Sequence, residues 1–306
     1  MNHPQPLLAG VLPVVQTPFT ADDAIDRQVL EREIEWLLRQ GAQGVVVAMV
    51  SEVLRLSTDE RRLLAQLVCQ ASRGQGGVVV SVGAESTHTA VALARHAAES
   101  GASALMAIPP LATAAPQSEL LAYFTALLEA TPLPLIVQDA SGYVGRPLPI
   151  ELLARLLDEH GPERVWFKPE AVPIGPRLSA LRQATSGRAR VFEGSGGIAL
   201  VDSYRRGIVG TMPGADLVGA VVALWAALER GDDERAYAIS LPLSSLVALQ
   251  AGLDGFLAVE KHLLVRQGIF TNARVRGPVA FRLDAETAAE VDRLFDRLTA
   301  VVADGG

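Results

Sequence analysis

The sequence predicts an α/β protein, a (β/α)8 TIM barrel followed by a C-terminal helical extension. Short apolar runs alternate with longer stretches of helical periodicity, and they do so eight times between residues 11 and 212. The runs are apolar along their whole length, which is typical of parallel strands covered by helices on both faces. Eight such units fit a closed barrel better than an open doubly wound sheet. The first strand–helix junction also lacks the Gly-x-Gly-x-x-Gly pattern of a dinucleotide-binding fold.

The first four units have clear boundaries. Expected strands cover residues 11–15, 44–50, 78–82 and 104–108, and expected helices cover residues 26–40, 57–72, a stretch from residue 87, and 116–130. Residues 57–60, Ser-Thr-Asp-Glu, predict a capped helix start, because a serine at this place accepts a hydrogen bond from the backbone three residues on. Pro109 and Pro110 end the fourth run.

The last four units follow the same pattern. Expected strands cover residues 133–137, 165–168, 190–193 and 208–212. A loop over residues 139–147 precedes a helix that runs to His160, and another helix begins near residues 173–176. From residue 232 onward the pattern is helical only, with expected helices over 234–250, 253–267 and 285–302. We therefore expect a barrel over residues 1–231 and a helical extension over 232–306 that packs on it.

Composition and charge exclude several classes of protein. The chain has 306 residues, of which 49% are hydrophobic and 20% charged, so it can bury a core. Its net charge of −7 is spread along the chain, which excludes nucleic acid and anionic membrane as expected partners. No run approaches the roughly 20 apolar residues of a membrane span, and residues 1–10 lack the features of a signal peptide. We expect a cytoplasmic protein.

The single cysteine and the five histidines offer little metal chemistry. Cys69 excludes an internal disulfide, and its apolar helical surroundings predict a core thiol. The histidines fall in the N-terminal tail or in helical stretches, and no His-Glu-x-x-His motif occurs. We expect no metal and no cofactor. A divalent metal held only by carboxylates, through Asp139, Glu170 and Glu193, is the remaining alternative.

The most informative stretch is residues 165–170, Val-Trp-Phe-Lys-Pro-Glu. Lys168 ends an apolar strand, and it shares the chain with only one other lysine, Lys261. A position that needs only positive charge can use arginine, whereas a position that needs an amine able to lose its proton cannot. Burial lowers a lysine pKa, and the neutral amine then attacks a carbonyl to form a Schiff base. The alternative is a structural ion pair between Lys168 and Glu52, Glu170 or Glu193.

Other polar residues follow strand ends, where the active sites of such barrels lie. Gln138 and Asp139 end the fifth expected strand, Glu193 ends the seventh, and Ser51 and Glu52 follow the second. We expect these groups to face the mouth of the barrel, although Glu52 is better explained as a helix-start or interface carboxylate. Residues 194–197, Gly-Ser-Gly-Gly, either hold a phosphate or carboxylate through backbone amides or form a tight turn.

Several motifs together resemble the dihydrodipicolinate synthase / N-acetylneuraminate lyase family of class I aldolases, over nearly the whole chain. They are the opening strand with Thr-Pro-Phe at residues 17–19, the second strand and following loop at 41–60, the strand that ends in Lys168, Arg-Arg-Gly at 205–207, and Gly-Thr-Met-Pro-Gly at 210–214. The resemblance implies that Lys168 is the Schiff-base lysine. It also implies a homo-oligomer, a dimer or a homotetramer.

The chain departs from the family pattern at the expected pocket. Residues 48–52 read Ala-Met-Val-Ser-Glu where the family usually shows Gly-Thr-Thr-Gly-Glu, so Ser51 is a partial substitute for the hydroxyls. Gln138 replaces the proton-relay tyrosine, and an amide has no acid–base function near neutral pH. Tyr143 stands roughly where the synthase has an arginine, and Pro110-Leu111 replace an aromatic pair. Gln138 and Val50 therefore disfavour dihydrodipicolinate synthase activity, and unmodified sialic-acid lyase chemistry is disfavoured too.

The prediction that remains is a Schiff-base lyase, an aldolase or dehydratase, acting on pyruvate, a related 2-oxo acid or a 2-keto-3-deoxy sugar acid. Its expected catalytic residues are Lys168, Gln138 and Asp139. The residues expected to bind substrate are Ser51, Val50, Tyr143, Glu193, Gly194 and Ser195. The proton shuttle is Asp139, Glu193, Tyr143 or a bound water. The alternative class is a catalytically retired family member that binds a small ligand.

Overall fold

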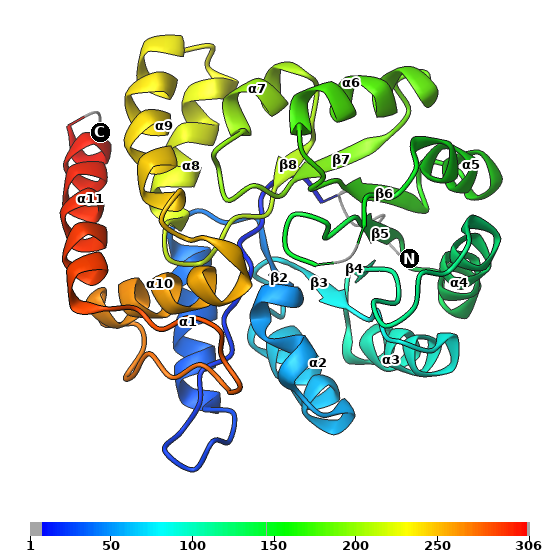
Figure 1. Ribbon diagram of the computed structural model, residues 1–306, viewed down its shortest axis with the longest axis horizontal. Coiled ribbons are helices and arrows are strands. Elements are labelled where there is room, and N and C mark those ends of the chain that lie inside the picture. Colours follow the sequence, from blue (N-terminus) through cyan, green and yellow to red (C-terminus); the bar gives the residue numbers. More distant parts are fainter. Residues whose placement is uncertain (1–7, 145, 305–306) are drawn as a thin grey trace.

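The computed structural model describes residues 8–144 and 146–304 of the protein (Figure 1). Residues 1–7, on which the expectation of no signal peptide depends, lie outside the described residues, as do Gly145 of the loop at 139–147 and residues 305–306. The strands form one eight-stranded parallel sheet. They are β1 (Gly10–Val11), β2 (Gly44–Val47), β3 (Gly77–Ser81), β4 (Ala104–Ala107), β5 (Leu135–Gln138), β6 (Val165–Lys168), β7 (Arg190–Glu193) and β8 (Gly210–Thr211).

A helix follows each strand and lies outside the sheet (Figure 1). These helices are α1 (Arg27–Arg39), α2 (Thr58–Ala71), α3 (Thr87–Ser100), α4 (Gln117–Ala130), α5 (Ile150–His160), α6 (Ile174–Ala184), α7 (Leu200–Arg205) and α8 (Val218–Glu229). The sheet closes where the β1 segment meets β2, through a parallel bridge between Val14 and Val46. The amide of Val15 donates to the Val46 carbonyl at 2.9 Å, and that of Val46 donates to the Pro13 carbonyl at 2.9 Å. The predicted (β/α)8 barrel is confirmed.

Two strands differ from their predicted extents. The continuous ladder of the first strand covers only β1 instead of residues 11–15, because Pro13 has no amide to donate and interrupts it. Beyond the proline, Val14 pairs through single bridges to Val46 and Gly214. β2 ends at Val47 instead of residue 50, and the short 3-10 turn η1 (Met49–Ser51) follows it. An apolar run does not by itself distinguish a buried strand from a buried turn that continues it.

The predicted cap on α2 is confirmed. The Ser57 hydroxyl accepts a hydrogen bond from the Glu60 amide at 3.2 Å, and the Glu60 carboxylate accepts one from the Ser57 amide at 2.8 Å. This reciprocal pair satisfies two of the backbone donors that every helix start leaves without an acceptor. Cys69, in the same helix, is buried in the core as predicted, and burial raises the pKa of its thiol to about 11.

The core has two layers because successive side chains of a strand point to opposite faces. One layer fills the barrel and includes Ile136, Trp166 and Phe192. The other layer packs between the strands and the surrounding helices, and it includes Val137 and Phe167. Neighbouring residues of one strand therefore belong to different environments, and this alternation continues to the strand ends.

Three further helices, α9 (Asp233–Val247), α10 (Gly252–Arg266) and α11 (Ala285–Ala303), lie on one side of the barrel beside α8 (Figure 1). α9 contacts α7, α8 and α11, and α10 contacts η1. Their extents agree with the predicted helices to within a few residues. The division of the chain at residues 231 and 232 stays a prediction.

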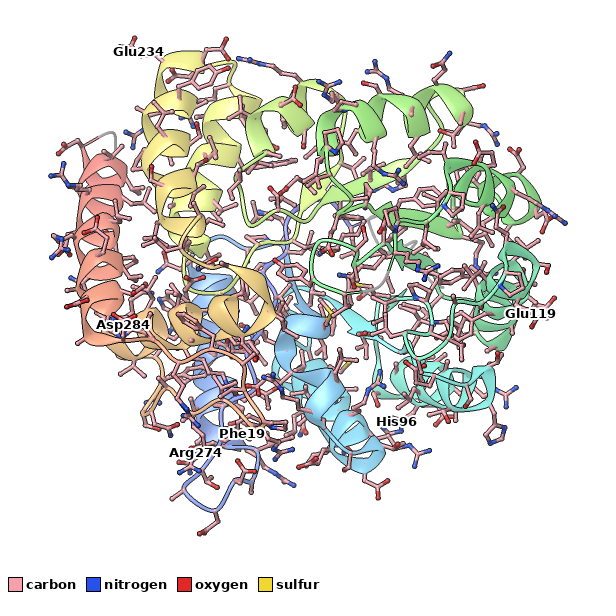
Figure 2. All side chains as sticks on the ribbon, in the orientation of Figure 1. Phe19, His96, Glu119, Glu234, Arg274 and Asp284 are labelled. Atoms are coloured by element: carbon pink, nitrogen blue, oxygen red, sulfur yellow. The ribbon has the colours of Figure 1, made fainter. Side chains whose placement is uncertain are left out.

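The described residues include no single helix of sufficient length and apolarity to cross a membrane. α9 and α10 reach that threshold only when they are taken together, and a bend of 115° separates them. Charged and polar side chains of Glu119, Glu234, Asp284 and His96 lie at the periphery of the molecule in Figure 2.

Lys261 of α10 attaches the helical extension to the barrel. Its buried ammonium forms an ion pair with Glu52 and donates to the carbonyls of Thr17, at 2.8 Å, and Arg274, at 2.7 Å. Phe19 and Arg274, which both contact Lys261, lie near each other in Figure 2. The Lys261 ammonium is 4.8 Å from the centre of the Phe19 ring, in a cation–π contact.

This arrangement corrects one step of the sequence argument. Lys261 has three acceptors around a compact ammonium, a geometry that suits lysine better than the planar guanidinium of arginine. A rare lysine in this chain therefore does not by itself indicate amine chemistry. Glu52, in turn, serves as the buried partner of Lys261.

We predict that Lys261→Met lowers the free energy of unfolding by about 3–5 kcal/mol, because Glu52 is then a buried charge without its partner. Urea unfolding followed by circular dichroism measures the change. The matched control is Arg155→Met, which breaks an ion pair of 2.7 Å with Glu159 on the surface and is expected to cost less than about 1 kcal/mol. Equal losses in the two variants would contradict the prediction.

Candidate active site

The end of β6 points a lysine into the barrel. Val165 and Phe167 face the helices, whereas Trp166 faces the interior. Lys168 shares the orientation of Trp166 because side chains alternate along a strand. Gln138, at the end of β5, is paired in register with Lys168, and it follows interior-facing Ile136 by two residues. The two side chains therefore lie together at the carboxyl end of the barrel, where such proteins carry their active sites.

A small cavity lies beside the Lys168 amine. Its volume is about 20 Å³, which is room for a water molecule by the measure of ~10–15 Å³ for each water. Most of its lining is apolar, and the polar side chains come from the ends of β5 and β6 and from the loop after β5. The lining residues are Val14, Ala48, Met49, Val50, Gln138, Tyr143, Lys168, Glu170, Gly194, Gly196, Met212, Pro213, Gly214 and Phe256.

Glu170 is the partner of Lys168. The two side chains form an ion pair, and each residue is only 4% exposed. The amide nitrogen of Gln138 donates to the same Glu170 oxygen, Oε1, at 3.1 Å. Two acceptors in this group, Glu170 Oε2 and Gln138 Oε1, are buried without a hydrogen-bond partner among the described residues. The ion pair expected as one explanation of Lys168 is therefore present, with Glu170 as its carboxylate.

Gly194 leaves room for this pair. It follows β7 and lines the cavity opposite Lys168. A Cβ atom at this position would lie 2.6 Å from Lys168 Nζ and 2.9 Å from Glu170 Oε1, both shorter than any ordinary contact. The sequence analysis included Gly194 among the expected substrate-binding residues. In the structure, a glycine at this position leaves space for the Lys168 amine and the Glu170 carboxylate.

The turn after β2 presents backbone to the cavity. Met49 and Val50 both line it, and within residues 8–144 and 146–304 neither backbone amide donates a hydrogen bond. Ser51, expected to bind substrate, is absent from the lining. Its hydroxyl donates to the Val15 carbonyl at 2.5 Å and accepts from the Ala48 amide at 3.1 Å, so it fixes the turn.

Asp139 lies on the opposite face of its strand from Gln138. It accepts a hydrogen bond from the Leu148 amide at 3.4 Å, and one of its oxygens is 3.6 Å from the Arg177 guanidinium. Burial raises the pKa of the Asp139 carboxyl. It holds the segment before α5 and does not line the cavity.

Glu193 and Ser195 are also outside the lining. Glu193 follows helix-facing Val191 by two residues, and its carboxylate accepts hydrogen bonds from the Thr211 hydroxyl, at 2.8 Å, and from the Ser195 amide. The Ser195 hydroxyl accepts from the Ala199 amide at 2.9 Å. These contacts build the tight turn that was one of the two explanations for residues 194–197.

Tyr143 reaches the cavity from the loop after β5. It packs edge-on against Phe256 of α10, with 6.2 Å between the ring centres. Burial raises the pKa of the Tyr143 hydroxyl, and the carboxylates of Glu170, Glu260 and Glu193 raise it further. This hydroxyl keeps its proton at every physiological pH, so it is a hydrogen-bond donor to whatever occupies the cavity.

A buried acidic pair lies behind the cavity wall. A Cβ atom on Gly214 would lie 2.8 Å from oxygens of both Asp216 and Glu260, so these two carboxyls are close neighbours. Gln16 links Glu260 to the wall, since its amide nitrogen donates to Glu260 and to the Val50 carbonyl at 2.9 Å. Burial raises the pKa of Asp216 to about 7 and that of Glu260 well above its usual value. No pattern in the sequence predicts this pair.

In the part of the chain that the structure describes, no group of three histidine, cysteine, aspartate or glutamate side chains is arranged to hold a metal ion. Fold and site together define a class, (β/α)8-barrel proteins with a buried lysine amine in a cavity at the mouth of the barrel.

Comparison with known proteins places the chain within this class. Residues 7–297 match the Dihydrodipicolinate synthetase family. The chain therefore belongs to the dihydrodipicolinate synthetase family, whose members are lyases of the class I aldolase type.

Three relatives illustrate the range of the family. A 4-hydroxy-tetrahydrodipicolinate synthase from Rhizobium meliloti is 29% identical over 94% of this chain and 97% of its own length. An L-2-keto-3-deoxyarabonate dehydratase from Azospirillum brasilense is 27% identical over 96% of this chain and 95% of its own. In fold, the chain is similar to a Ruminococcus gnavus sialic acid aldolase, with a TM-score of 0.86, 20% identity and coverage of 97% and 98%.

We predict that Gly194→Ala lowers the free energy of unfolding by about 1–3 kcal/mol, because the new methyl group collides with the buried Lys168–Glu170 pair. The control is Gly255→Ala in α10, where the nearest atom to a new Cβ is 3.5 Å away and alanine favours the helix. Urea unfolding of both variants measures the difference. An effect at residue 194 no larger than that at residue 255 would be evidence against the steric role.

We predict that the protein is less stable at pH 8 than at pH 5.5. Asp216 binds its proton more tightly when folded, with a pKa of about 7 against an ordinary value of 3.8. Its contribution to stability is therefore complete below about pH 4 and is lost as the pH rises through 7. Between pH 5.5 and 8 we expect a loss of about 1–2 kcal/mol, and Glu260 and Glu33 act in the same direction.

The measurement is urea unfolding at both pH values for the natural protein and for Asp216→Asn, which keeps the shape of the side chain but does not titrate. The variant is expected to lose less stability across this range. The same pH dependence in both proteins would show that Asp216 is not the titrating group.

Proposed function

We propose that this protein is a Schiff-base-forming lyase, an aldolase or dehydratase, that acts through Lys168 on pyruvate, a related 2-oxo acid or a 2-keto-3-deoxy sugar acid. The observation that carries the proposal is the Lys168 amine itself. It is buried at the carboxyl end of β6, it borders a cavity, and Glu170 is its single hydrogen-bond partner among the described residues. The family membership supports the same chemistry.

The first steps follow from these contacts. Lys168 gives a proton to Glu170 and becomes a neutral amine, since the two groups are in direct contact. The amine attacks the keto carbon of the substrate, and the carbonyl oxygen leaves as water after protonation, which gives an iminium ion. The positive iminium withdraws electrons from the neighbouring carbon. A C–C bond to that carbon can then break, or that carbon can lose a proton and a C–O bond on the next carbon can break. We propose that the backbone amides of Met49 and Val50, two residues that line the cavity, bind the substrate carboxylate.

The hydroxyls that the resemblance implies for the substrate carboxylate are mostly replaced by apolar side chains. Val50 lines the cavity, and Gln138 replaces the proton-relay tyrosine that the resemblance implies. Both substitutions disfavour dihydrodipicolinate synthase activity, which stays the alternative reaction within the family. The names of the relatives do not decide the reaction, because a synthase and a dehydratase match the chain at 29% and 27% identity.

A second candidate function is binding of a small ligand without catalysis. One observation favours it. Lys168 is held by a carboxylate next to a cavity of about 20 Å³, which is smaller than a 2-oxo acid, so a substrate enters only if side chains such as Tyr143 or Phe256 shift. Assembly as a dimer or tetramer and a cytoplasmic location also stay predictions.

We predict that borohydride reduction in the presence of pyruvate, or of a panel of 2-keto-3-deoxy sugar acids, attaches the acid covalently to Lys168. The chain contains only two lysines, so mass spectrometry of the peptides assigns the adduct unambiguously between Lys168 and the buried Lys261. Lys168→Arg keeps the positive charge beside Glu170 but cannot form an imine, and it should give no adduct.

The acid that traps best would indicate the substrate. If the folded natural protein forms no adduct with any 2-oxo acid of the panel, the lyase proposal fails. The ligand-binding function is then the better explanation of the site.

A further inference from the structure

We infer that Glu170 is the proton-transfer group of this site. It has the role that the resemblance assigns to a tyrosine and that Gln138, an amide, cannot perform. The inference rests on the proposed function, since it needs an imine on Lys168. It assigns a catalytic role to a residue that the sequence analysis considered only as an ion-pair partner or a metal ligand.

The position of Glu170 is the first argument. It follows Lys168 by two residues and lines the same cavity. Oε1 is occupied by the Lys168 ammonium and by the Gln138 amide nitrogen, the latter at 3.1 Å. Oε2 is buried and has no partner among the described residues. A buried acceptor without a donor costs free energy. A bound molecule that offers a hydrogen to this oxygen removes that cost.

The other carboxyl groups considered for proton transfer lie elsewhere in the described chain. Asp139 and Glu193 do not line the cavity and are held by backbone amides. Asp216 and Glu260 lie behind Gly214, outside the lining. Among the described residues that line the cavity, Glu170 is the carboxylate.

Tyr143 is the remaining ionisable group at the cavity. Burial raises the pKa of its hydroxyl, so it keeps its proton and can donate a hydrogen bond but does not act as a base. Gln138 is an amide and does not titrate. Gln138 Oε1 and Glu170 Oε2 are both buried acceptors without a hydrogen-bond donor among the described residues. The pair suits a substrate hydroxyl, which has a hydrogen to give.

The reaction can be balanced with Glu170 alone. In a 4-hydroxy-2-oxo acid bound as the Lys168 iminium, Glu170 takes the proton of the C4 hydroxyl. The electrons of the broken O–H bond form the new C4–O double bond, the C3–C4 bond breaks, and its electrons give an enamine that neutralises the iminium nitrogen. Glu170 then returns the proton to C3, and water releases the shortened 2-oxo acid from Lys168. In a dehydration, Glu170 takes a C3 proton instead, and the C4 hydroxyl leaves as water.

Both routes involve proton transfer at C3, so pyruvate alone tests the role of Glu170. On the imine of pyruvate, Glu170 removes a methyl proton to give the enamine, and reversal of this step in D2O introduces deuterium. We expect the natural protein to exchange the methyl hydrogens of pyruvate, measured as loss of the methyl signal in proton NMR. Lys168→Arg should exchange no faster than buffer.

The decisive variant is Glu170→Gln, which has nearly the same shape and keeps hydrogen-bonding capacity. Because Lys168 can no longer give its proton to Glu170, we expect slower trapping on Lys168 by borohydride. For each trapped molecule we expect exchange at least 100-fold slower than in the natural protein, as loss of general acid–base catalysis costs ~10²–10⁴ in rate. Glu159→Gln makes the same chemical change at an exposed site and should leave exchange unchanged. Glu170→Asp should recover part of the exchange.

The outcomes separate the inference from the proposed function. Trapping with little exchange in Glu170→Gln supports the role of Glu170. Trapping with exchange at the natural rate overturns it and leaves Glu170 as a counter-ion, while the lyase proposal stands. No trapping in the natural protein overturns both. If circular dichroism shows that Glu170→Gln does not fold, Glu170→Asp decides, because a purely structural carboxylate would restore exchange per trapped molecule in full.

Discussion

The alternation of side chains along each parallel strand is the constraint on which this site depends. In a closed barrel one face of every strand looks inward, so residues two apart share an environment and neighbours do not. Trp166, Lys168 and Glu170 follow one another on the inner side, and Ile136 leads to Gln138 in the same way. Asp139 and Glu193 are out of step with these inward-facing residues by one position. Their carboxylates therefore accept hydrogen bonds from backbone amides outside the cavity.

The two lysines show how a structural ion pair differs from a reactive one. Both are buried and both have a carboxylate partner. Lys261 has three acceptors, one for each hydrogen of its ammonium, and it connects segments from distant parts of the chain. Among the described residues, Lys168 has one partner and an adjoining cavity, and its neighbours include two acceptors that lack a donor. An ammonium with all its hydrogens satisfied is held in place, whereas the hydrogen bonding around Lys168 leaves room for a molecule in the cavity to complete it.

Around this amine the family framework is retained while the chemistry of the pocket wall differs. The turn at Met49–Ser51 lines the cavity through Met49 and Val50, whose side chains are apolar, while the Ser51 hydroxyl is bonded to backbone. Behind Gly214, Asp216 and Glu260 share a buried region in which their charged forms are disfavoured. The carboxylate of Glu170 is therefore set in a largely apolar pocket, with Lys168 as its compensating charge.

The sequence by itself determined the barrel, its eight units, the helices that follow it and the position of Lys168 at a strand end. These features depend on local periodicity and on the order of residues along the chain, which a sequence contains directly. The partner of each charged group was decided only by the tertiary structure. Lys261 meets Glu52 across 209 residues, and Gln138 meets Glu170 across 32, because closing the sheet brings separate strands together. The role of Glu170 was nevertheless within reach, since its spacing of two from Lys168 gives both residues the same face. What the sequence could not contain was the absence of a donor for Glu170 Oε2, which is a property of the closed barrel as a whole.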